Sequence, residues 1–169
     1  GIKIAEHKLE VAAEADKPAA KALVMRVYTQ RLKHYPKGKA GIYDDIASFK
    51  REQGASDEEV YEWLEKTFKE DPTELSAKNI YKYFDIILIK YKDSDTQKVF
   101  DTYDEVGEAL ELKRENYTKT IDAINAKDST TLSKKDTKKR RISQQIITNL
   151  SIVESGLDQK LAAISTCER

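Results

Sequence analysis

The longest regular pattern in this sequence is a series of mostly apolar residues that recurs in alternating steps of four and three. Its members are Val99, Tyr103, Val106, Leu110, Lys113, Tyr117, Thr120 and Ile124. This spacing places all of them on one side of an α-helix that packs against a partner helix. The predicted helix ends near Lys127 and is on the order of 50 Å long. Lys113 and Thr120 are polar positions in this seam, and they indicate a specified register between the packed helices.

A second long helix is predicted after the polar turn at residues 128–131, from about Ser133 to Ser165. Its apolar seam consists of Ile142, Ile146, Leu150, Val153, Leu157, Leu161 and Ile164. Two long helices that are joined by a short turn lie antiparallel to each other. We therefore predict that residues 95–166 form a long antiparallel helical hairpin.

Residues 1–34 also show helical spacing of apolar side chains, and we predict that they form the first helix of a bundle with this hairpin. Pro18 either kinks this helix or occupies the first turn of a second one. Residues 42–92 contain shorter amphipathic segments, which we expect to form a small helical appendage. The predicted fold class is all-α: an elongated three-helix bundle with a long antiparallel C-terminal hairpin and a small helical appendage.

Residues 80–91 are the stretch whose composition also suits a β-strand, because they are rich in Ile, Tyr and Phe. One helical face nevertheless includes Ile80, Phe84, Ile87, Leu88 and Tyr91. The sequence predicts no second strand, and an isolated strand is unstable. We therefore predict that this stretch is a buried helix.

The composition fits thin helical bundles better than a compact globule. Apolar residues make up 39% of the 169 residues and charged residues 36%, and there are three prolines and six glycines. Long helices with a narrow apolar stripe and a wide solvated face have this balance. A single cysteine excludes an internal disulfide. No apolar run is long enough to cross a bilayer, so we expect a soluble protein. Because the chain starts at Gly1, the sequence does not decide whether a signal peptide has been removed, and it does not indicate the cellular compartment.

The formal net charge is zero, so any electrostatic function must come from the segregation of charges along the chain. Residues 119–141, around the predicted turn, include eight basic and three acidic side chains, a net charge of +5. The basic residues are Lys119, Lys127, Lys134, Lys135, Lys138, Lys139, Arg140 and Arg141. Acidic residues dominate residues 57–74 and 95–111 instead. This bipolar distribution either steers contacts with a charged partner or reflects the preference of acidic residues for helix starts.

Two interpretations of the basic cluster stay open. Its eight cations form a candidate anion-binding surface for phosphates, nucleic acid, anionic lipid or an acidic protein. Alternatively, they are the solvated end of a hairpin, as charge runs on helices usually are. Aromatic side chains, which stack on bases, are absent from Thr118 onward, and this disfavours specific nucleic-acid binding.

Tyrosine is the second notable residue type, with nine copies against four of Phe and one of Trp. Tyrosine is common at protein interfaces, where its ring is buried and its hydroxyl stays hydrated. Tyr81, Tyr83 and Tyr91 cannot all face inward together with the apolar residues of the same helix, so they are the candidate protein-interface residues. The alternative is that these tyrosines line the seams of a thin bundle.

No pattern in the chain predicts catalysis or a bound metal. His7 and His34 are far apart and belong to no metal-binding motif. The glycine-rich loops that bind nucleotides and the nucleophile motif of hydrolases are also missing. We predict that the protein is not an enzyme and uses no metal or cofactor.

The predicted function is a non-catalytic helical protein–protein interaction protein, such as an adaptor, a surface component or a secretion-associated component. Its expected partner is another protein. The alternative is an anion-binding module that recognises nucleic acid, phosphate or an acidic partner through the basic cluster. The sequence determines neither the identity of the partner nor the oligomeric state.

Overall fold

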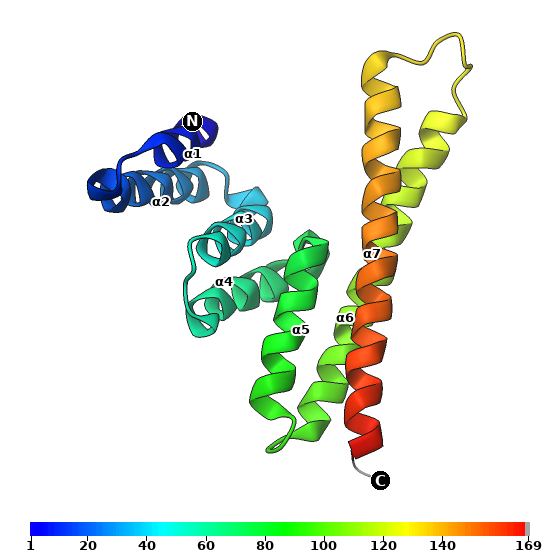
Figure 1. Cartoon of the computed structure of the whole chain (residues 1–169). Helices are drawn as coiled ribbons and strands as arrows, with labels where there is room; N and C mark the ends of the chain where they lie inside the picture. Colours follow the sequence, from blue (N-terminus) through cyan, green and yellow to red (C-terminus); the bar gives the residue numbers. More distant parts are fainter. Residues whose placement is uncertain (168–169) are drawn as a thin grey trace. The chain divides into compact units, whose positions relative to one another are not determined.

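The computed structural model describes the fold of residues 1–167, and this part of the chain is helical without a β-strand (Figure 1). The prediction of an all-α protein is therefore confirmed. The α-helices are α1 (Ile2–Val11), α2 (Lys17–His34), α3 (Lys39–Glu52), α4 (Asp57–Glu70), α5 (Ala77–Tyr91), α6 (Thr96–Asn125) and α7 (Lys134–Cys167). Three short 3₁₀ turns lie at Glu14–Asp16, Pro36–Gly38 and Pro72–Glu74. The stretch with mixed propensities is helical, as predicted, and belongs to α5.

The chain divides into two compact units between Glu74 and Leu75. The first unit contains α1 to α4, and the second contains α5 to α7. This grouping differs from the prediction, which joined residues 1–34 to the hairpin and treated residues 42–92 as one appendage. The structure packs α2 against α1 and α3, whereas α5 packs against both α6 and α7. The third helix beside α6 and α7 is therefore α5.

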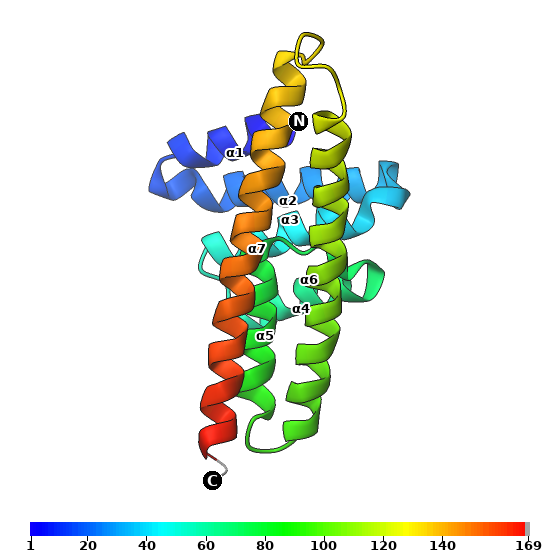
Figure 2. The ribbon, with the colours of Figure 1, turned by 90° about the vertical axis from the view of Figure 1, so that its right-hand side faces the viewer.

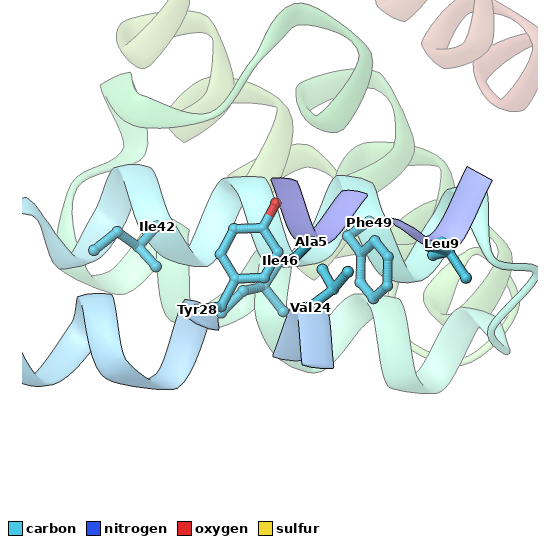
Figure 3. Packing of buried hydrophobic residues seen from close by; sticks show 7 residues of the cluster. All are labelled: Ala5, Leu9, Val24, Tyr28, Ile42, Ile46 and Phe49. Carbon is cyan, nitrogen blue, oxygen red and sulfur yellow. The ribbon is translucent and has the colours of Figure 1, made fainter. Parts of the chain in front are cut away.

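The core of the first unit is formed by side chains from α1, α2 and α3 (Figure 3). Its buried members are Ala5, Leu9, Val24, Tyr28, Ile42, Ile46 and Phe49. Pro18 lies in the first turn of α2, where its missing N–H has no helical partner to lose. The segment 1–34 is thus two helices, and the apolar stripe of α2 is satisfied by α1 and α3.

The second unit consists of three helices of very different lengths. α5 has 15 residues, α6 has 30 and α7 has 34. At 1.5 Å per residue, α5 is about 22 Å long and α6 about 45 Å. α6 and α7 run side by side in opposite directions and extend beyond the end of α5 (Figure 2).

The part of the second unit that α5 covers contains its largest buried apolar side chains. They include Ile80, Phe84, Ile87, Val99, Val106, Leu110 and Leu157, each at most 2% exposed. The Phe84 ring meets the Tyr103 ring edge-on at a centroid distance of 6.1 Å. Lys160 of α7 forms a half-buried ion pair with Asp85 of α5, at 2.5 Å.

Beyond α5, the hairpin has a much thinner apolar seam. We call this part, residues 114–150, the distal hairpin. Leu150 is buried at its inner boundary; outside that boundary the buried side chains are Ile124 and Ser143. Ile142, which the sequence placed in the seam, is 44% exposed, and the next residue faces α6 in its place. The ends of the distal hairpin therefore depend on polar contacts more than on apolar burial.

We expect Phe84→Ala to lower the free energy of unfolding by about 3–5 kcal/mol, because it leaves a cavity where α5 meets α6. Ile89→Ala is the control on the same helix, since Ile89 is 62% exposed, and its effect should stay within about 0.5 kcal/mol. Chemical denaturation followed by circular dichroism measures both. Equal effects of the two substitutions would contradict the packing of α5 described above.

Candidate interaction surface at the end of the hairpin

The turn between α6 and α7 is closed by hydrogen bonds that converge on Asp136. The Ser133 hydroxyl accepts from the backbone N–H of Asp136 at 3.0 Å, and the Asp136 carboxylate accepts from the backbone N–H of Ser133 at 3.4 Å. This reciprocal pair is a capping box, which satisfies two amides at the start of α7. Lys127, which follows α6, donates to both carboxylate oxygens of Asp136 at 3.1 Å. One carboxylate therefore joins the two helix ends.

The acidic side chains of this turn are both used within it. The Lys127 ammonium holds the pKa of Asp136 below its ordinary value, and hydrogen bonds from Ser133 act in the same direction. The Asp136 carboxylate is therefore ionised at neutral pH and matched by one lysine. Asp128 accepts a hydrogen bond from the backbone N–H of Thr130 at 3.1 Å. Both Asp136 and Asp128 therefore contribute hydrogen bonds that stabilise the turn.

Three of the predicted cations lie together on one face of α7. Lys134, Lys138 and Arg141 are separated by four and three residues, so their side chains leave the helix in the same direction. All three are exposed. They span about 10 Å along the helix axis. We call these three residues the basic face.

The other predicted cations are distributed differently. Lys135 and Lys139 are exposed but leave α7 about 100° further around the helix. Arg140 is half-buried and donates to the side-chain oxygen of Asn125 at 3.1 Å, so it fixes α7 to the end of α6. Lys119 is six residues before Asn125, which places it about 9 Å further along α6. Lys119, Lys127 and Arg140 are therefore not part of the basic face.

The three candidate interface tyrosines do not form one surface. Tyr83 is 6% exposed and belongs to the buried part of α5. Tyr81 packs against Gly156, where an added Cβ would lie 3.1 Å from the ring, and Lys160 lies 4.9 Å from its centroid. Tyr91 has Lys90 and Lys98 near its ring, at 5.5 and 5.0 Å. Helical residues that are two positions apart point in different directions. The side chains of Tyr81 and Tyr83 therefore lie on different sides of α5.

A shallow acidic groove lies on the α6–α7 pair outside the distal hairpin, further from the turn, between residues 103–110 of α6 and residues 154–158 of α7. It has a volume of about 310 Å³. We call it the acidic groove; its charged and polar lining residues are Tyr103, Asp104, Glu108, Glu154 and Asp158. The Tyr103 hydroxyl donates to Asp158, and this bond raises the pKa of Tyr103 to about 12. Arg114 pairs with Glu154 at 2.5 Å and with Glu111 at 3.0 Å.

The sequence indicated the acidic stretch at 95–111 but not the contribution of α7 to this groove. Glu154 and Asp158 are isolated acids in a mostly neutral stretch of the sequence. They reach the α6 carboxylates because the two helices run antiparallel through the turn. Residues at similar distances from the turn lie opposite each other in an antiparallel pair. Counting residues from the turn along α6 and along α7 could therefore have placed Glu154 and Asp158 beside the acidic residues of α6.

The function of these surfaces must be inferred from their own chemistry. No protein-family model, curated protein or solved structure matches the chain. Among the side chains of residues 1–165, no three from His, Cys, Asp or Glu are placed to share a metal ion. Within the described part of the chain, no helix has both the length and the apolar character that a bilayer crossing requires.

Acidification is expected to loosen the start of α7. Because the pKa of folded Asp136 is lowered, its stabilising effect is fully present above the unfolded pKa of about 3.9 and is lost as the pH falls through the lower, folded value. Amide protection factors of Ser133, Asp136 and Thr137, whose N–H groups are hydrogen-bonded at this turn, should fall when hydrogen exchange is measured from about pH 6 down to about pH 3. Asp136→Asn should be less protected at pH 6 and show little further change. A wild-type profile that stays flat with pH would contradict the role of this carboxylate.

Proposed function

We propose that the protein is a non-catalytic interaction protein that binds an acidic surface of a partner protein through the basic face. The observation that supports this most is the exposure of Lys134, Lys138 and Arg141 on one side of α7. Asp128 and Asp136, the acidic side chains of the adjoining turn, are engaged by residues of the turn itself. Three exposed cations in line form a surface complementary to carboxylates at helical spacing.

The position of these cations supports a functional role because it opposes local stability. The start of a helix carries a partial positive charge, which favours acidic and disfavours basic side chains. Like charges separated by four residues also repel each other along a helix. The first eight residues of α7 nevertheless include six basic ones. A partner with negative charges removes both unfavourable interactions.

A protein partner fits this surface better than nucleic acid or a membrane. The distal hairpin has no aromatic side chain near the basic face on which a base could stack. Gln145 and Thr148 continue the basic face along α7, and the exposed apolar residues Ile142 and Ile152 are single positions beside and beyond it. They form no continuous apolar strip that could enter a lipid layer. The alternative, a general anion-binding module, predicts that phosphate-rich ligands bind as well as acidic proteins.

We expect the full chain to bind fluorescent poly-glutamate at about 50 mM NaCl and to release it at about 500 mM NaCl, where exposed charges are screened. Lys134→Glu/Lys138→Glu/Arg141→Glu should abolish this binding. The matched control is Lys3→Glu/Lys8→Glu/Arg26→Glu, because these residues are exposed, lie in the first unit and change the net charge equally. Fluorescence anisotropy measures the affinities.

Equal losses in both variants would contradict the proposal, since they would show a dependence on net charge alone. Single-stranded nucleic acid and vesicles with anionic lipid serve as comparison ligands. If either binds more tightly than poly-glutamate through the same three residues, the general anion-binding alternative replaces the protein partner.

A further inference from the structure

α7 keeps the same orientation towards α6 along its length. Residues that are eighteen positions apart in a helix are separated by five full turns, so their side chains leave it in the same direction. Asp136 and Glu154 form one such pair, Arg140 and Asp158 form another, and all four bond to residues of α6 or just after it. These bonds are Asp136–Lys127, Glu154–Arg114, Arg140–Asn125 and Asp158–Tyr103. Directions on the part of α7 that α5 covers therefore also hold in the distal hairpin.

The same spacing identifies the residues of the distal hairpin that lie on the side of α5. Gly156 and Lys160 of α7 both contact α5, one against a tyrosine ring and the other in an ion pair with an aspartate. Lys138 and Ile142 precede them by eighteen residues each, so they point to the same side, about 27 Å nearer to the turn. Both are exposed, Ile142 to 44%. This side of the hairpin therefore presents a cation and an apolar residue one turn apart.

The distal hairpin has room on this side for one further short helix. Lys113 of α6 donates to the backbone carbonyl of Leu75, two residues before α5 begins, so the cover by α5 stops near this point. α6 continues for twelve residues from Lys113 to Asn125, which is about 18 Å. Among the described residues of the second unit, no third helix lies along this stretch (Figure 2). A helix of three to four turns fits this length.

Resting on the proposed function, we propose that the acidic partner presents an amphipathic helix that packs along the distal hairpin on the side of α5. Its carboxylates contact the basic face. Its apolar side chains cover Ile142 and the half-buried Ile146, which follows one turn later. The partner helix thus lies where α5 would continue if it were longer.

The charge of this surface selects an acidic helix. Lys138 belongs both to the basic face and to the side of α5, and Lys134 and Arg141 leave α7 about 40° and 60° further around, away from α6. A basic helix would be repelled by these three cations. Since Lys138 and Ile142 are four residues apart, a helix packed along α7 meets both with an acidic and an apolar residue one turn apart.

A designed peptide tests this inference on the full chain. The fluorescent probe has about 14 residues, with Leu recurring every three or four positions and Glu at most others. The control peptide has the same composition, but its Leu residues share no helical face. Fluorescence anisotropy at about 50 mM NaCl should show the amphipathic peptide bound at least about tenfold more tightly than the control peptide. Circular dichroism should show that the peptide becomes helical on binding.

Substitutions on α7 distinguish the apolar contact from the charged one. Ile142→Gln should weaken the amphipathic peptide at least about fivefold, whereas poly-glutamate, which has no apolar side chain, should bind as before. Ile152→Gln is the matched control, because Ile152 is 65% exposed on the same helix but points in the direction of Lys134, eighteen residues earlier. Lys138→Glu should weaken both ligands. Circular dichroism of each variant reports whether the helices are retained.

Three results would overturn the inference. One is equal affinity for the amphipathic and the control peptide, and another is an equal effect of Ile142→Gln and Ile152→Gln. The third is a dimer of the chain alone, seen by sedimentation equilibrium, that Ile142→Gln dissociates, since a second copy would then cover this side.

The outcome for the proposed function is separate. If poly-glutamate binds through the basic face but the amphipathic peptide binds no better than its control, the helix is excluded and the proposed function remains. If the chain binds neither poly-glutamate nor the peptides, both proposals are wrong.

Discussion

The second unit depends on the difference in length between α5 and the two helices that it packs against. An isolated pair of helices has little apolar surface to bury, and the third helix supplies most of the cover. Phe84 and its neighbours provide that cover for only half of the hairpin, because α5 ends after 15 residues. Beyond this point the chain replaces apolar burial by polar contacts, which is why the distal hairpin is rich in charge.

The charged residues of the distal hairpin fall into two groups: those that form polar contacts between the helices and those that do not. Asp136 with Lys127, and Arg140 with Asn125, hold the two helix ends together. Arg114 does the same at the inner boundary through Glu154. Among the described residues, the other cations at the start of α7 (Lys134, Lys135, Lys138, Lys139 and Arg141) contribute no such bond between the helices, although they occupy the end of a helix that disfavours them. This distinction between used and unused charge is the physical basis of the proposed interaction surface.

Much of this organisation is readable from the sequence, and the part that is not has a clear cause. Periodicity predicted the helical state, including α5, and charge counting found the cluster of cations to which Lys134, Lys138 and Arg141 belong. Periodicity shows which side of a helix is apolar but not which other helix covers it. The sequence analysis therefore assigned residues 1–34, rather than α5, as the third helix beside the hairpin. Charge counting likewise grouped Lys119 and Lys127 with the cations of α7, because it contains no information on how far each lysine lies from the turn or which one has a carboxylate within reach.

The most direct test of the basic face as the interaction surface is an NMR titration of the isotope-labelled full chain with poly-glutamate. Amide chemical-shift changes should be confined to the first three turns of α7, around residues 134–145. Changes should be small or absent in the first unit. Perturbations centred on α5 or on the first unit, or spread evenly over all exposed lysines, would contradict the account.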